Sequence, residues 1–181
     1  MKKLLMVAST VLLAASVCYA QGPTATADLA VTVGAEAAIQ EVSSGPLIST
    51  GTTFSNYTST TDLTYWVRTT SGGGGTITVK ITTDFSTGGS GGGPSVTTPP
   101  TPGDLLTYTC TAAAPVTGTA NPCGSAQTAS TVTDTNVVTF LGSTQSAKAG
   151  DDFKTMWTLT NDPSYLAGTY TAVATYTISA T

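Results

Sequence analysis

The chain has 181 residues and a formal net charge of −4, contains no histidine, and is only 9% charged, against about 25% in an average soluble protein. The absence of histidine excludes imidazole-based catalytic triads and histidine-ligated metal sites, and six basic residues are too few for a surface that follows a phosphate backbone. We therefore expect no enzymatic activity, no nucleic-acid binding and no cofactor.

Residues 1–20 have the pattern of a cleaved secretory signal. Lys2 and Lys3 precede an apolar run from Leu4 to Val17, and Ala20 is the small residue before the expected cleavage site. The remaining 161 residues would carry a net charge of −6. No other stretch approaches the roughly 18 consecutive apolar residues of a membrane-spanning helix. We expect a secreted protein, located outside the cell or at its surface, with no membrane span in the mature chain.

Apolar and polar residues alternate with a period of two through the mature chain, which predicts an all-β fold. Threonine, which favours strands, is present in 40 copies. The expected strands cover residues 29–39, 63–68, 76–82, 105–112, 127–141 (one or two strands), 153–159 and 168–181. The segment from Gly72 to Gly75 is expected to be a hairpin loop between the second and third of these strands. Seven to nine short strands favour an immunoglobulin-like Greek-key β-sandwich.

The domain organisation follows from composition. Residues 21–40 are expected to be an N-terminal extension and residues 41–181 a single β-sandwich domain. Within this domain residues 86–103 are rich in glycine and proline, which cannot pack a core, so we expect a long exposed loop there. A division into two domains at this loop is the alternative, but it leaves halves of about 80 residues that are each short of strands.

Cys110 and Cys123 are expected to form a disulfide, because they are an even pair in a chain bound for an oxidising compartment. Closing a loop of this length stabilises a fold by roughly 3 kcal/mol. Two free thiols are the alternative. Cys18 lies within the signal; a lipoprotein anchor there would need a small residue before it, where Val17 stands.

Both ends of the mature chain carry strictly alternating apolar residues. At the N-terminal end they occupy every odd position, namely Leu29, Val31, Val33, Ala35, Ala37 and Ile39. At the C-terminal end the corresponding face holds Gly168, Tyr170, Ala172, Ala174, Tyr176 and Ile178. The apolar N-terminal face must be buried away from water, either against a neighbouring strand of its own sheet or in a groove on another subunit. Periodicity alone does not separate these two possibilities.

These two segments resemble those of fimbrial subunits assembled by chaperone and usher, especially the colonisation-factor type, and of the related spore-coat-U-like secreted domains. The stretch from Leu29 to Ile39 resembles their donor strand. The stretch from Ala167 to Thr181 resembles their last strand, including a glycine at the fourteenth position from the end, here Gly168. Two positions depart from the pattern, since residue 180 is alanine rather than an aromatic and Gly34 is out of phase with the apolar face.

The resemblance implies a subunit of a pilus or fimbria that polymerises by donor-strand complementation, with residues 24–40 inserted into the next subunit. Its partners would then be other copies of the chain, a periplasmic chaperone and an outer-membrane usher. The alternative is a monomeric secreted binding or adhesin domain that recognises a glycan or surface ligand through loop 86–103 and exposed aromatic residues. In that case the N-terminal strand would fold back into its own sheet.

Two other groups of residues are weaker candidates for binding. Tyr65, Trp66 and Trp157 could form a carbohydrate platform, although aromatic residues in strands more often belong to the core. Asp151 and Asp152 could bind Ca²⁺, although such a pair is more often a solvated turn. We expect no metal site and no catalytic residue.

Overall fold

The computed structural model describes residues 27–85 and 92–181. The chain divides into two units, of which the first ends at Thr32 and the second spans Val33–Thr181. In the first unit, the described residues 27–32 form no regular secondary structure. All strands described below belong to the second unit. The expected position of the signal, residues 1–20, lies outside the described residues.

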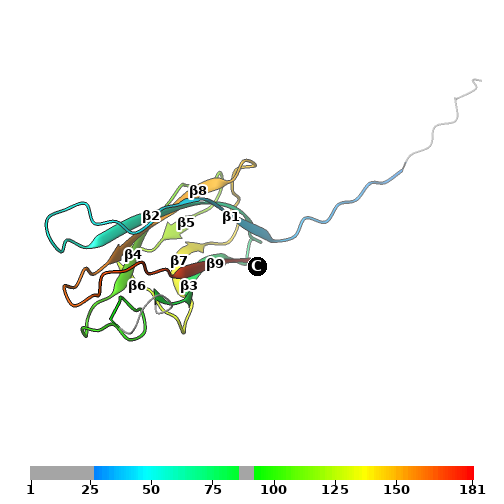
Figure 1. Cartoon of the computed structure of the whole chain (residues 1–181). Helices are drawn as coiled ribbons and strands as arrows, with labels where there is room; N and C mark the ends of the chain where they lie inside the picture. Colours follow the sequence, from blue (N-terminus) through cyan, green and yellow to red (C-terminus); the bar gives the residue numbers. More distant parts are fainter. Residues whose placement is uncertain (1–26, 86–91) are drawn as a thin grey trace, which may run out of the picture. The chain divides into compact units, whose positions relative to one another are not determined.

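Nine β-strands form two antiparallel sheets in the described part of the chain (Figure 1). The strands are β1 (Glu36–Ser44), β2 (Tyr57–Arg68), β3 (Gly75–Thr83), β4 (Leu106–Ala112), β5 (Ala120–Pro122), β6 (Gln127–Thr128), β7 (Thr135–Phe140), β8 (Asp151–Leu159) and β9 (Val173–Ala180). One sheet has the order β1-β2-β8-β4-β6 and the other β5-β7-β3-β9. The prediction of an all-β fold with two antiparallel sheets is confirmed.

The core lies between the two sheets and is built from the alternating apolar positions of both. Tyr65 of β2 contacts Phe140 of β7, with ring centroids 5.0 Å apart, and Phe153 of β8, at 6.2 Å. The Tyr65 hydroxyl donates a hydrogen bond to the carbonyl of Ala113 at 3.0 Å, so its one polar group is satisfied inside the protein. Ile77 of β3 is fully buried beside them. Tyr65, Ile77 and Phe153 each occupy an alternating apolar position of a predicted strand, so the period-two pattern explains why they are buried.

The predicted hairpin at Gly72–Gly75 is wrong. β2 lies in one sheet and β3 in the other, so the chain crosses between the sheets after Arg68. Thr69, only 6% exposed, donates its backbone N–H to Thr144 at 2.9 Å, and Thr70 donates to the C-terminal residue Thr181 at 3.0 Å. Alternation shows that two strands exist, but it does not show which neighbours they pair with, and here both find other partners.

Cys110 and Cys123 lie at disulfide distance, as predicted, with their Cα atoms 5.2 Å apart. Cys110 belongs to β4 and Cys123 directly follows β5, so the bond links the two sheets at one side of the sandwich. We expect the double substitution of both cysteines by serine to lower the free energy of unfolding by roughly 3 kcal/mol, because the unfolded chain loses its crosslink. Denaturant titration of both forms measures this, and equal midpoints would contradict it.

The described part of the Gly/Pro-rich loop, residues 92–103, is more buried than the sequence analysis predicted. Pro94 and Ser95 are buried, and the backbone carbonyl of Gly92 accepts a hydrogen bond from the N–H of Leu166 at 2.8 Å. A side chain at Gly93 would collide with the ring of Tyr170, so this glycine permits close packing. The loop therefore packs against the segment that leads into β9 instead of extending into solvent.

Candidate interaction groove

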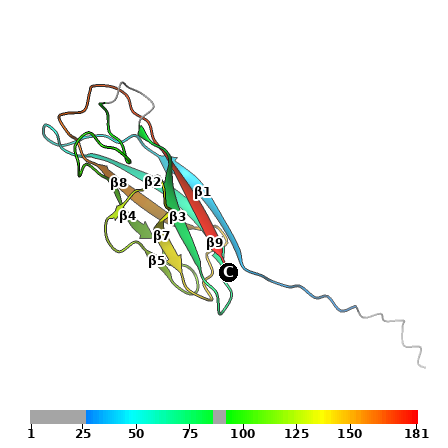
Figure 2. The same ribbon diagram turned by 90° about the horizontal axis from the view of Figure 1, so that it is seen from below.

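The candidate site is the seam between β1 and β9. Each is an end strand of its sheet, and they lie side by side (Figure 2), with Cα atoms of the two strands within 8 Å of each other. No β-ladder joins them in the described part of the chain. At the other side of the sandwich the Cys110–Cys123 bond ties the sheets together. One side is thus crosslinked, while the other has two strand edges without a shared ladder.

Apolar side chains of both edge strands pack against the core and are only partly buried. They are Ala37 and Ile39 of β1 and Ala174, Tyr176, Ile178 and Ala180 of β9. An edge strand with free N–H and C=O groups and a half-covered apolar face is a template for another strand. The outer edges of these two strands are therefore places where another strand could add.

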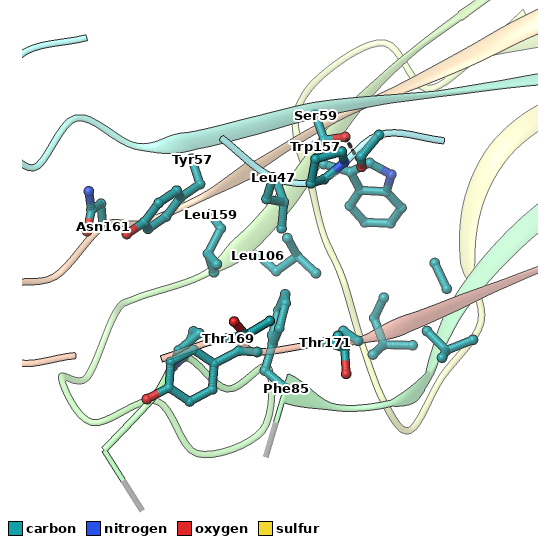
Figure 3. A pocket seen from close by; sticks show the side chains of 18 of the residues that line it. Leu47, Tyr57, Ser59, Phe85, Leu106, Trp157, Leu159, Asn161, Thr169 and Thr171 are labelled. Atoms are coloured by element: carbon teal, nitrogen blue, oxygen red, sulfur yellow. Dashed lines mark hydrogen bonds between the residues drawn. The ribbon is translucent and has the colours of Figure 1, made fainter. Parts of the chain in front are cut away.

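A cavity of about 790 Å³ opens where the seam widens, between the end of β1 and the segment that leads into β9. Figure 3 shows Leu47 and Tyr57 on one side of it and Phe85 on the other, with Leu106 and Leu159 between them. Its floor reaches the core at Trp157, which is 7% exposed and donates its indole N–H to Thr61 at 3.1 Å. We call this cavity, together with the seam, the groove.

The groove floor contains residues that sequence reasoning did not single out. Leu106, Trp157 and Leu159 fall in predicted strands, but nothing in the pattern indicated that a cavity would reach them. Leu47 and Phe85 lie outside regular alternation, so no sequence signal pointed to them.

The C-terminal strand is shorter than the pattern predicted. β9 begins at Val173, because its partner β3 ends at Thr83, which pairs with Val173. Of the residues predicted for this strand, Gly168, Tyr170 and Ala172 precede β9 and line the groove. Ala174 and Tyr176 lie in β9 and line the cavity of the groove, whereas Ile178 lies farther along the seam, opposite Ile77.

Residues 167–172 offer more unpaired backbone along the groove. Their backbone groups make no hydrogen bond to any other described residue. Tyr170 and Ala172 are nevertheless half-buried against the core, so the inward face continues beyond the ladder. The edge available to an incoming strand therefore extends from Thr169 through β9.

Asp84 holds the loop that forms one wall of the groove. Its carboxylate accepts hydrogen bonds from the backbone N–H groups of Phe85, Val96 and Thr97 at 2.7, 2.8 and 3.1 Å and from the hydroxyl of Ser95 at 2.8 Å. Burial by itself would raise the pKa of Asp84, but these hydrogen bonds outweigh it and lower the pKa below its ordinary value.

Replacing Asp84 with alanine is expected to release the wall, because four donors lose their acceptor. Amide hydrogen exchange should become faster at residues 92–98, and the faster exchange should extend to the neighbouring segment at Leu166.

A pH dependence is also expected. The Asp84 carboxylate stabilises the wall at pH values above the unfolded-state pKa, and this contribution is lost as the pH falls through the lowered folded-state pKa. Protection of residues 92–98 should therefore decrease on acidification in the wild type and stay independent of pH in Asp84→Asn.

The structure divides the predicted N-terminal donor face into two parts. Ala37 and Ile39 lie in β1 and pair with Val67 and Tyr65 of the chain's own β2. Leu29 is 97% exposed, Val31 85% and Val33 61%, and Ala35 is also exposed. The expected strand over 29–39 thus begins only at Glu36 and runs on to Ser44. The sandwich domain accordingly starts before residue 41, and a donated segment cannot include Ala37 and Ile39 while they hold this ladder.

Within the second unit, β2 offers no backbone partner to the residues directly before Glu36. Continuing the register of β1 on β2, in which Glu36 faces Arg68, would set Ala35 opposite Thr69 and Gly34 opposite Thr70. The backbone N–H groups of those two threonines instead donate hydrogen bonds to the carbonyls of Thr144 and Thr181. The ladder therefore begins at Glu36, although the apolar alternation of the sequence already begins at Leu29.

The remaining sequence candidates contribute little to a site. Tyr65 and Trp157 are core residues, which leaves only Trp66 half-exposed, and its indole N–H donates to the carbonyl of Lys148 at 3.3 Å. Asp151 accepts from the N–H of Ala147 and Asp152 from the hydroxyl of Thr64, both at 3.1 Å. Within residues 27–85 and 92–181 no three His, Cys, Asp or Glu side chains cluster as a metal site.

The described residues also contain no helix with the length and hydrophobicity to cross a membrane. No family model, curated protein or solved structure matches the chain. The functional assignment therefore rests on the geometry of the groove and of the segment before Glu36.

Proposed function

We propose that the protein is a structural subunit of an extracellular filament, a pilus or fimbria, in which each subunit inserts its N-terminal segment into the groove of the next. The observation that carries this proposal is the apolar groove beside the unpaired edge of β9. The donated segment precedes β1, which begins at Glu36. The inserted strand would complete an immunoglobulin-like sandwich that lacks one strand.

The lengths of the segment and the groove support the proposal. Residues 21–33, which follow the expected cleavage site, span about 43 Å when extended at about 3.3 Å per residue. The edge from Thr169 to Ala180, which contains no bend, spans about 40 Å by the same measure. One extended segment thus covers the whole edge.

The side chains of the segment match the apolar lining of the groove. Burying Leu29, Val31 and Val33 contributes roughly 1.5–3 kcal/mol each, or roughly 5–9 kcal/mol together, before the cost of ordering the segment. Main-chain hydrogen bonds to the β9 edge add affinity, as in other cases of strand addition. An unfilled groove would instead invite aggregation. In this proposal a periplasmic chaperone covers the groove before assembly, and an outer-membrane usher exports the subunits.

A monomeric secreted binding domain is the second candidate. It is favoured by a hollow of about 440 Å³ beside the half-exposed Trp66, which is also lined by Arg68, Gln145 and Lys148. An aromatic ring among polar side chains suits a glycan or surface ligand, and adhesion would then not need polymerisation.

The test is an electrophoresis experiment on protein sheared from the surface of cells that produce the full chain. A polymer joined by inserted strands should resist detergent until heated, because such joints dissociate very slowly. We expect a ladder of subunit multiples without boiling and a single monomer band after boiling. A monomer band in both lanes would contradict the filament and favour the binding domain.

A further inference from the structure

Arg68, the last residue of β2, contacts both ends of the junction where the N-terminal segment joins β1. Its Nε donates a hydrogen bond to the backbone carbonyl of Gly34, and its Nη2 bonds to the carboxylate of Glu36, each at 2.8 Å. The planar guanidinium thus binds the main-chain carbonyl of Gly34 and the side chain of Glu36, which lies two residues farther along the chain.

The pattern of side chains does not show where the donated segment ends and β1 begins. The apolar alternation runs unbroken from Leu29 to Ile39, so either part could pair with β2 or be donated. The β2 backbone stops being available after Arg68, since Thr69 and Thr70 bond elsewhere. At that point the Arg68 side chain supplies the carbonyl of Gly34 with a hydrogen bond that β2 can no longer supply.

We propose that Arg68 is a positioning residue that sets the boundary between the subunit's own strand and the donated segment. This inference rests on the proposed function. With the carbonyl of Gly34 held on its own subunit, the inserted stretch ends at Val33 and almost no slack chain remains between neighbours. The boundary held by Arg68 therefore fixes how successive subunits are oriented.

The experiment compares filaments sheared from cells that produce the wild-type chain, Arg68→Ala or Arg68→Lys. We expect Arg68→Ala filaments to assemble but to bend more easily, with a persistence length reduced about two-fold, because the junction gains backbone freedom. Arg68→Lys should fall between them, since an ammonium lacks the fork that holds both oxygens at once. Electron micrographs provide the persistence length and the regularity of the subunit repeat.

A matched control is Lys154→Ala, which removes the other ion pair of this sheet, between Lys154 and Asp62. It should leave the filaments unchanged. The melting temperature of the isolated subunit should change little in both alanine variants, because exposed ion pairs contribute little to stability.

Two results would overturn the role of Arg68 alone. The first is that Arg68→Ala filaments are as stiff and regular as those of the wild type. The second is that they soften while the melting temperature of the isolated Arg68→Ala subunit also falls. Either result would leave the filament proposal standing if the double variant Val31→Asp/Val33→Asp still fails to assemble. Absence of filaments from the wild-type chain would overturn both proposals.

Discussion

Replacing Val31 and Val33 with aspartate is expected to abolish filament assembly while export of the subunit continues. In the proposed joint both side chains enter the apolar groove, and two unpaired carboxylates there would cost several kcal/mol each. That loss is comparable with the roughly 5–9 kcal/mol that the three apolar side chains contribute. The unboiled sample should therefore show only monomer, at a secreted amount close to that of the wild type.

Thr32→Asp is the matched control for this variant. Thr32 lies between the two valines and points to the opposite face of an extended strand, so its charge would stay in solvent. The ladder should persist in Thr32→Asp. A ladder from the Val31→Asp/Val33→Asp variant would contradict insertion of this face, and loss of the ladder in Thr32→Asp would show that charge anywhere on the segment prevents assembly.

The second large effect is expected when the segment is supplied as a separate peptide. A chain that begins at Gly34 keeps the whole groove but has no segment to donate. Adding a peptide of residues 21–33 should fill the groove and stabilise only the folded state. At a free peptide concentration of 100 times Kd the gain is about 2.7 kcal/mol, or roughly 5–10 °C in melting temperature for a domain of this size.

The same peptide with aspartate at positions 31 and 33 is the control and should leave the melting temperature unchanged. Equal effects of the two peptides would contradict a specific apolar fit.

Amide hydrogen exchange on dilute full-length protein distinguishes donation of the segment to another subunit from folding of the segment onto its own subunit. Residues 29–33 should exchange freely in the monomer and become protected in the filament; protection in the dilute monomer would support folding within one chain.

Local patterns in the sequence determined the all-β class, most strand positions and the inward faces. Alternation placed Tyr65, Ile77 and Phe153 in the core because the pleat of a strand sends every second side chain to the same side. The cysteine pair followed from composition and expected compartment. These features depend on residues close together in the chain, and for that reason they could be predicted.

Only the tertiary structure decided which strands pair, where they end and where the groove lies. β2 and β3 were predicted as a hairpin, but the crossing at Thr69 and Thr70 sends them to different sheets. That crossing leaves Gly34 and Ala35 without a partner on β2, although the alternation of the sequence continues through them. The sequence thus determined that apolar residues alternate from Leu29 to Ile39. Contacts between distant residues decided that pairing with β2 begins only at Glu36, because strand pairing depends on backbone neighbours that no local pattern specifies.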